Sequence, residues 1–289
     1  MAKTILVTGA YGQLSSEMQA LSSAYPQYDF LLVTKDELPI DNAEAVTKFF
    51  EENDIDICVN CAAYTAVDKA ETEVEEAMAV NAIATGTLAA ICSERKILFI
   101  HISTDYVFDG NGSSPYKEDH PVSPVNAYGL SKLKGEQLAM ELNPSTIIIR
   151  TSWVYSSFGN NFVKTMLRLM KERESLNVVD DQVGCPTYAA DLAEVIMQII
   201  QQPAVAKANP GIYHFSDEGV ISWYQFAEAI KELSGSQCKV NPIPSSQYPT
   251  PAKRPYYSVM DTSKIKQTFN IAPPHWKASL EQCLKFLLT

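Results

Sequence analysis

Basic residues are scarce in this sequence. Its 289 residues include 23 Lys and Arg against 34 Asp and Glu, which gives a formal net charge of -11. A chain without a basic field cannot hold a row of phosphates, so this composition argues against a nucleic-acid partner and against an anionic membrane surface. A small anionic substrate is compatible with the charge, provided that local cations meet it.

Long apolar runs are also lacking. We find no continuous run of the ~18 apolar residues that a membrane span needs, and the first residues lead directly into a predicted strand rather than into a signal peptide. The cysteines are few and widely scattered, which is typical of reduced thiols and not of a disulfide framework. They are Cys58, Cys61, Cys92, Cys185, Cys238 and Cys283. We therefore expect a cytoplasmic protein without a membrane partner.

One cysteine pair has the Cys-x-x-Cys form, Cys58-Val-Asn-Cys61. It falls on a predicted strand and at its end, not at a helix N-terminus, and no second pair complements it. Buried strand residues are therefore the favoured interpretation, with redox or metal use as the alternatives. The four histidines show no ligand spacing, so no metal site is predicted from spacing.

Apolar, β-rich runs alternate with helical patterns through the first half of the chain. The predicted strands are residues 4–8, 30–33, 55–60, 97–102 and 146–150. Continuous apolar runs of this length are typical of strands that are buried on both faces of a parallel sheet. The pattern predicts an α/β fold, a doubly wound, Rossmann-like parallel sheet with a smaller C-terminal substrate-binding lobe.

The length predicts two parts. We expect a dinucleotide-binding Rossmann domain over residues 1–150 and a mainly substrate-binding lobe over 151–289, with an interleaved boundary. Part of 176–203 is expected to pack back on the first domain. The lobe should lie near the C-terminal edge of the sheet, where ligands of such sheets bind.

A glycine turn follows the first predicted strand, Gly9-x-x-Gly12-Gln13-Leu14. Glycines let the backbone approach a pyrophosphate, and the N-terminus of the next helix offers free N–H groups. The turn predicts dinucleotide binding, and an ordinary helix-entry turn is the alternative. Ser15 stands where a third glycine is usual.

The second predicted strand ends in Thr34-Lys35. An acidic residue at this place favours NAD, whereas a cation accommodates the 2′-phosphate of NADP. Lys35 therefore favours NADPH, with NADH still a possible substitute. A solvated surface charge is the alternative for Lys35, and the adjacent Asp36 supports that alternative.

The densest pattern of chemical groups comes after the strand at 97–102. Thr104 and Asp105 follow that strand, and Tyr128-x-x-x-Lys132 comes about twenty residues later. On a helix, Tyr128 and Lys132 lie one turn apart on one face. A phenol beside an ammonium group predicts proton transfer at a carbonyl.

With these pieces placed, the chain resembles the dTDP-4-dehydrorhamnose reductases, a family of extended short-chain dehydrogenases/reductases. Tyr-x-x-x-Lys alone marks only the superfamily, and the other motifs are more specific. The resemblance is carried by Gly9–Leu14, Val59–Glu71, Ser103–Gly110, Tyr128–Glu136, Arg150–Tyr155, Gly159–Phe162, Asp181–Thr187 and Tyr248–Pro255.

The resemblance implies a reaction. NADPH would reduce the C4 ketone of a nucleotide-sugar substrate, dTDP-4-dehydro-6-deoxy-L-mannose, to give dTDP-L-rhamnose. Tyr128 would donate the proton, with its pKa lowered by Lys132 and the oxidised nicotinamide, and Thr104 would bond the ketone oxygen. Asp105 and Trp153 would contact the substrate. Arg254 lies in the predicted substrate lobe, where its charge suits a diphosphate, and a structural arginine is the alternative.

The resemblance also implies a set of cofactor contacts. One group would hold the pyrophosphate, another would line the adenosine and ribose, and Lys132 would bond the nicotinamide ribose. In full, the expected cofactor-binding residues are Gly9, Gly12, Gln13, Leu14, Thr34, Lys35, Ile40, Ala63, Tyr64, Thr65, Ile102, Tyr128 and Lys132. Asn81 matches an asparagine that organises a proton-relay water in the superfamily.

Several points stay open. Known members of the family can dimerise through a magnesium ion held by surface carboxylates. Glu17 matches one of those positions and the others find no match, so magnesium is doubtful and either a monomer or a homodimer is expected. Two other functions remain possible: another nucleotide-sugar epimerase or dehydratase of the same fold, and a non-catalytic regulatory subunit of methionine adenosyltransferase.

Overall fold

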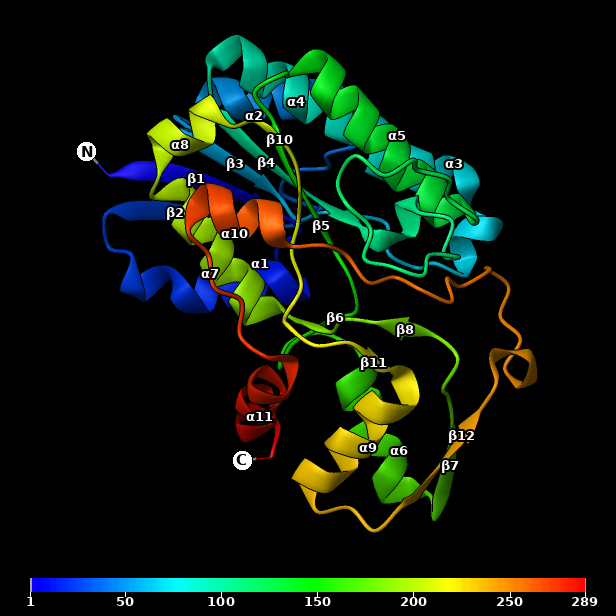
Figure 1. Cartoon of the computed structure of the whole chain (residues 1–289). Helices are drawn as coiled ribbons and strands as arrows, with labels where there is room; N and C mark the ends of the chain where they lie inside the picture. The colour runs from blue at the N-terminus through cyan, green and yellow to red at the C-terminus, as the bar shows by residue number, and fades with distance from the viewer. Residues whose placement is uncertain (1, 289) are drawn as a thin grey trace.

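A six-stranded, wholly parallel sheet forms the centre of the protein in a computed structural model that describes residues 2–288 (Figure 1). The strand order is β10-β5-β4-β3-β1-β2. The chain moves from β1 outward to β2 and then returns to β3 on the other side of β1, which confirms the predicted doubly wound α/β class. The strands are β1 Lys3–Thr8, β2 Tyr28–Val33, β3 Ile57–Asn60, β4 Leu98–Thr104, β5 Ile147–Thr151 and β10 Gly211–His214.

Helices cover both faces of the sheet, because alternate side chains of a strand point to opposite sides. Ile5 and Val7 pack in a core with helices on one face, whereas Leu6 packs in a second core on the other face. The first face is covered by α1 Gln13–Leu21, α7 Ala189–Ile200, α8 Pro203–Ala208 and α10 Ser263–Phe269; the second is covered by α2 Ala43–Glu52, α4 Ala84–Arg95 and α5 Ala127–Leu142 (Figure 1).

A second body, here called the small lobe, has its own core below the sheet in Figure 1. It consists of α6 Phe162–Glu172, β7 Ser175–Val179, α9 Trp223–Ser234, β12 Lys239–Ile243 and α11 Trp276–Leu287. Two short strand pairs lie between the sheet and the small lobe, β6 Val154–Tyr155 with β9 Thr187–Tyr188 and β8 Val183–Gly184 with β11 Ile221–Ser222.

Several segments after residue 150 join the sheet or pack in the hydrophobic core on one of its faces. β10 pairs with β5, α7 supplies much of the core beside α1, and α10 adds Ile265 and Phe269 to that core. The expected domain limits, 1–150 and 151–289, stay a prediction, and their outermost residues, 1 and 289, lie outside the described chain.

Side-chain caps begin several helices. Asn42 accepts hydrogen bonds from the N–H groups of Glu44 and Ala45, so it caps α2. Ser222 caps α9 in a capping box with Gln225. Asn126 caps α5, the helix that carries Tyr128 and Lys132.

One helical run passes a test of length and mean hydropathy for a membrane span, although it is not a continuous apolar run. The continuous helical run Val74–Arg95, formed by α3 Val74–Met78, a π-helical turn at Ala79–Ile83 and α4, has the length and composition of a membrane span. It nevertheless packs against the sheet, and 56% of its apolar window is buried inside the protein. The run therefore has the character of a core helix.

Candidate functional site

The glycine turn between β1 and α1 requires its first glycine. Gly9 has a φ of +74°, and a Cβ there would lie 2.9 Å from the backbone of Ala62. Gly12 is the N-cap of α1 and has extended backbone angles, with no side-chain cap over the helix N-terminus. Free N–H groups at such a terminus suit an anion such as a pyrophosphate.

Ser15 replaces the third glycine of the pattern and holds this turn together. It is fully buried, and its hydroxyl lies 2.6 Å from the Gly9 carbonyl oxygen and 3.1 Å from the Gly12 carbonyl oxygen. The departure from the glycine pattern therefore supplies an internal hydrogen bond to the turn, where a glycine would supply none.

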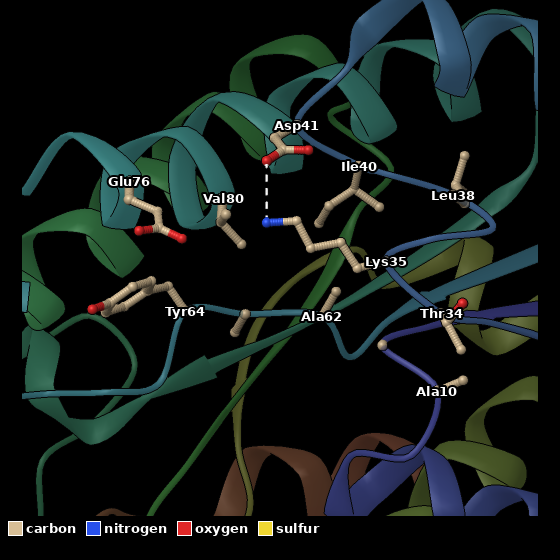
Figure 2. Close-up of a pocket in the computed structure, with 12 residues that line it drawn as sticks. Ala10, Thr34, Lys35, Leu38, Ile40, Asp41, Ala62, Tyr64, Glu76 and Val80 are labelled. Carbon is tan, nitrogen blue, oxygen red and sulfur yellow. Dashed lines mark ion pairs between the residues drawn. The ribbon is translucent and has the colours of Figure 1, made fainter. Parts of the chain in front are cut away.

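A hollow of about 290 Å³ lies beyond the carboxyl ends of β1, β2 and β3 (Figure 2). These strands meet where the chain reverses its direction across the sheet, which is the usual ligand position in open α/β sheets. The hollow is lined by Gly9, Ala10, Thr34, Lys35, Leu38, Ile40, Asp41, Ala62, Ala63, Tyr64, Glu76 and Val80.

The lining includes six of the expected cofactor-binding residues, namely Gly9, Thr34, Lys35, Ile40, Ala63 and Tyr64. Sequence reasoning missed Asp41 and Glu76, because their acidic side chains give no local signal for a nucleotide pocket. Gly12, Gln13, Leu14, Thr65, Ile102, Tyr128 and Lys132 do not line this hollow.

Three of these other residues have different neighbours. Leu14 packs in the core beside α7. The Gln13 side-chain oxygen accepts a hydrogen bond from Asn161 at 2.9 Å, which joins the glycine turn to the start of α6. The Ile102 carbonyl accepts a hydrogen bond from Lys132.

Lys35 projects across the hollow toward Asp41 (Figure 2). Its ammonium nitrogen lies 3.8 Å from the Asp41 carboxylate, and its side chain is 70% exposed. Such an open ion pair is weak and gives way readily to another anion. Next to it, the hydroxyl and the N–H of Thr34 both donate to Glu37, and these bonds lower the pKa of that carboxyl group.

Thr104, Asp105 and Tyr128 meet at the carboxyl end of β4. The Thr104 hydroxyl donates to Asp105 at 3.0 Å, and it also lies within hydrogen-bonding reach of Tyr128. Burial raises the pKa of Tyr128, hydrogen bonding to Thr104 partly opposes this shift, and the negative charge of Asp105 adds to it. The phenol is therefore protonated at neutral pH.

Asp105 is deeply buried. Burial raises the pKa of its carboxyl group to about 7, against the opposing effect of the Thr104 and Ser258 hydroxyls. Its second oxygen, Oδ2, has no hydrogen-bond partner in the described chain. An unsatisfied carboxyl oxygen beside a phenol is suited to bind a polar group that enters the site.

Lys132 is buried beneath this cluster. Its Nζ atom donates to the Ile102 carbonyl at 2.7 Å and lies 3.3 Å from Nε2 of His101. Burial lowers the pKa of Lys132 to about 8, although Glu136 and Cys61 favour its charged form. Burial dominates the pKa of Tyr128 in the protein alone, and the ammonium group is directed to Ile102 and His101. The expected lowering of the Tyr128 pKa by Lys132 together with the oxidised nicotinamide stays a prediction.

Asn81 lies in the π-helical turn and is buried. Its side-chain oxygen accepts from the Tyr64 N–H, and its amide nitrogen donates to the Tyr64 carbonyl and to the Ser131 hydroxyl. The side chain therefore joins the loop after β3 to α5. Its role in a water relay stays a prediction.

Of the two remaining candidates, Arg254 lies near the cluster, whereas Trp153 packs against the core of the small lobe. Trp153 has a φ of +49° and stacks on Trp223 with 3.6 Å between ring centroids. Arg254 donates to Asp68 at 2.8 Å and to the Tyr106 hydroxyl at 3.1 Å. The Tyr106 ring in turn meets the Tyr128 ring edge-on. Tyr106 therefore contacts both Arg254 and Tyr128.

Glu17 does not fit the surface magnesium site that the resemblance suggests. The residue is buried, and its carboxylate accepts a hydrogen bond from Ser156 at 2.5 Å. Burial also raises its pKa, which disfavours the charged form that a cation needs. Within residues 2–288, no group of three His, Cys, Asp or Glu side chains is arranged to hold a metal ion.

Comparison with known proteins identifies the family of this chain. Residues 3–288 match the RmlD substrate binding domain family. The chain belongs to this family. It is 43% identical over 284 residues to a dTDP-4-dehydrorhamnose reductase of Aggregatibacter actinomycetemcomitans, covering 96% of this chain and 97% of the relative.

Two solved structures of the family are closely similar. The dTDP-4-dehydrorhamnose reductase of Clostridium acetobutylicum has a TM-score of 0.94 and 41% identity, covering 99% of this chain and 100% of that one. The enzyme of Bacillus anthracis, in complex with NADP, has a TM-score of 0.93 and 38% identity over the full length of both chains. The expected family and the expected enzyme class, an oxidoreductase, are thereby confirmed.

Proposed function

We propose that this chain reduces the C4 ketone of dTDP-4-dehydro-6-deoxy-L-mannose to dTDP-L-rhamnose, with NADPH as reductant. The observation that carries the proposal is the cluster of Thr104, Tyr128 and Lys132 at the carboxyl edge of a sheet whose first strands end at a nucleotide-sized hollow. Relatives of 43% and 41% identity that bear this enzyme name support the choice of substrate.

The hollow is the proposed binding place of the adenosine half of the cofactor, which when bound supplies the hydride. The Gly9 turn and the N-terminus of α1 suit the pyrophosphate. Lys35 and Thr34 lie where a 2′-phosphate would enter, and Asp41 would release Lys35 to pair with it. The NADP complex of the Bacillus anthracis relative supports NADPH over NADH.

Tyr128 is the proposed proton donor to O4. Its raised pKa keeps the phenol protonated until negative charge develops on the substrate oxygen. Thr104 can donate a hydrogen bond to the same oxygen. Lys132 follows one helical turn later, and its positive charge would stabilise the phenolate that remains after proton transfer.

The substrate is proposed to lie between this cluster and the small lobe. The free Oδ2 atom of Asp105 is available for a sugar hydroxyl. Trp153, which stacks on Trp223, is the proposed apolar contact, and Arg254 brings a cation close to Tyr106. In a chain of net charge -11, a local arginine suits the diphosphate of a nucleotide sugar.

The deciding experiment follows NADPH oxidation with the 4-keto sugar nucleotide, in the wild type and in Tyr128→Phe. The variant should lose about 10²–10⁴-fold in kcat, the usual contribution of a general acid, while its Kd for NADPH stays within twofold. Tyr106→Phe is the matched control, because it removes a neighbouring hydroxyl and leaves the proton donor.

Other results would give other functions. Turnover without net NADPH consumption would indicate an epimerase or dehydratase. No turnover with any nucleotide sugar would indicate a binding protein. Near-wild-type kcat in Tyr128→Phe would overturn the assignment of the proton donor.

A further inference from the structure

A buried row of polar groups runs behind Lys132. His101 on β4 is fully buried, with Nε2 3.3 Å from Lys132 Nζ and Nδ1 3.1 Å from the side-chain amide of Asn60 on β3. The far side of the Asn60 amide lies 2.7 Å from the Thr8 hydroxyl on β1. Three adjacent strands thus contribute one residue each to a continuous row.

This row ends beneath the hollow. The Thr8 hydroxyl also accepts a hydrogen bond from the Ala62 N–H at 3.2 Å. Ala62 lines the hollow, and Gly9, the next residue after Thr8, lines it as well. The row therefore connects the floor of the proposed cofactor site to the ammonium group of Lys132.

Hydrogen-bond chemistry decides the tautomer of His101. An ammonium group has three donors and no acceptor, so Nε2 must offer a lone pair to Lys132. His101 is neutral, because burial and the charge of Lys132 lower its pKa well below the usual value. A neutral imidazole carries one proton, which must then reside on Nδ1.

The same reasoning orients the Asn60 amide. A protonated Nδ1 needs an acceptor at 3.1 Å, so the amide oxygen of Asn60 must face His101. Turning the amide by 180° exchanges its oxygen and nitrogen and leaves its shape unchanged. In the structure the Asn60 amide nitrogen faces His101 and Thr85, and the amide oxygen accepts from the Thr8 hydroxyl. The turned amide would instead donate to Thr8 across the same 2.7 Å and accept from the Thr85 hydroxyl, 3.4 Å away.

We propose that His101 is a positioning residue for Lys132, with Nε2 accepting from the ammonium group and Nδ1–H donating to Asn60. The role rests on the proposed function, since it acts through the lysine assigned there to proton transfer. His101 keeps the ammonium nitrogen fixed under the site and favours its charged form in a place where burial opposes charge.

Few other charges face Lys132. Glu136 lies one turn further along α5 and favours the ammonium form, but its carboxylate is already bound by Arg150 at 2.7 and 2.9 Å and by Ser103 at 2.6 Å. Cys61, after β3, is the remaining ionisable neighbour that affects the lysine. His101 is therefore the main acceptor, besides the Ile102 carbonyl, that contacts Nζ directly.

The first test measures the tautomer directly. Long-range ¹⁵N–¹H correlation spectra of the full-length, histidine-labelled protein are recorded at pH 7, and His101 is assigned by its loss in His101→Gln. The proposal expects a neutral ring protonated on Nδ1. A ring protonated on Nε2 would mean that Nζ accepts and that Lys132 is uncharged, which would overturn the proposal.

The second test uses the pH dependence of kcat. The alkaline limb of the wild type should reflect Lys132, whose pKa burial lowers to about 8. Loss of one hydrogen bond to a charged group in His101→Leu should move this limb down by about one pH unit. In His101→Gln the amide oxygen can occupy the Nε2 position. The alkaline limb of this variant should therefore lie close to that of the wild type.

His214→Leu is the matched control. His214 is an equally buried histidine, on β10, and it lies near Arg150 and not near Lys132. The variant His214→Leu should lower stability without moving the alkaline limb of the kcat profile. The proposal is contradicted if the limb stays in place in His101→Leu, or if it moves equally in both variants. If the wild type oxidises no NADPH, the proposed function fails, while the nitrogen spectra still decide the role of His101.

Discussion

Burial controls the protonation of the residues at the candidate site. The same desolvation raises the pKa of Tyr128 and of Asp105 and lowers that of Lys132, because each shift favours the uncharged form. Hydrogen bonds from Thr104 oppose the shifts at Asp105 and Tyr128, and Glu136 and Cys61 oppose the shift at Lys132. At pH 7 Tyr128 is therefore protonated, while Lys132, with a pKa of about 8, is still mostly charged.

The first prediction concerns Asp105→Asn and pH. Between about pH 4 and pH 7 the folded state holds a proton that the unfolded state releases, so this carboxyl group makes the wild type less stable as pH rises. The asparagine variant has no carboxyl group at this position, so it does not lose this stability as pH rises. Its melting temperature should exceed that of the wild type at pH 8, and the gap should narrow toward pH 4.

Asp109→Asn is the control of opposite sign. Hydrogen bonds from Asn111 and Tyr116 lower the pKa of Asp109, so its stabilisation is present above its unfolded pKa and is lost in acid. That variant should be less stable than the wild type at pH 8. A gap for Asp105→Asn that is the same at both pH values would contradict the assigned pKa shift.

The second prediction concerns coenzyme choice. Lys35→Ala should raise KM for NADPH about fivefold, as expected for an exposed ion pair of about 1 kcal/mol, and should leave KM for NADH within twofold. Lys48→Ala is the matched control, because Lys48 is similarly exposed and lies outside the hollow. Equal effects of Lys35→Ala on both coenzymes would exclude a 2′-phosphate contact.

At the scale of elements, α5 is held tightly against its neighbours. A Cβ on Gly129 would lie 2.2 Å from the Tyr106 carbonyl oxygen, and one on Gly135 would lie 2.0 Å from the Asn81 carbonyl oxygen. Glycines therefore let this helix approach the turn after β4 on one side and the π-helical turn on the other. The close approach fixes the height of Tyr128 and Lys132 over the sheet.

The third prediction tests this approach with Gly135→Ala. The added methyl group must displace backbone, so we expect a loss of about 3 kcal/mol in the free energy of unfolding, measured by urea denaturation. Gly86→Ala on α4 is the control, since its Cβ would meet only side chains of Leu138 and Leu142, and it should change stability much less. Equal losses in both variants would contradict a backbone clash.

At the scale of the whole molecule, one loop joins distant parts of the chain. Residues 248–256 run from the small lobe back along the sheet, where Arg254 pairs with Asp68 and the Lys253 carbonyl accepts from Asn126, the cap of α5 (Figure 1). Asp68 and Arg254 are 186 residues apart in sequence. The loop thereby connects the small lobe to the helix that carries Tyr128.

The fourth prediction concerns this connection. Arg254→Ala should raise KM for the nucleotide sugar about tenfold, because a charge-assisted contact is lost, and should leave KM for NADPH unchanged. It should also speed proteolysis within residues 248–256. Lys253→Ala removes the neighbouring exposed cation and should do neither; a matching rise in KM there would assign the effect to general charge.

The alternation of apolar runs and helical patterns was enough to predict the parallel sheet. Each of the first five strands was located to within two residues at its start, because strands buried on both faces leave a continuous apolar signature. The place of β10 beside β5 was not predicted, since a short strand carries no mark of its partner. The short pairs β6 with β9 and β8 with β11 were missed for the same reason.

The sequence alone determined the fold class, the family and the residues proposed for catalysis, because these depend on residue types at short spacings: Gly9-x-x-Gly12, Thr104-Asp105 and Tyr128-x-x-x-Lys132. Only the tertiary structure decided their electrostatics. Burial raises the pKa of Tyr128 in the protein alone, and the row from Thr8 through Asn60 to His101 reaches Lys132 from three different strands. Desolvation and hydrogen bonds between strands depend on distances in space, which no local pattern contains.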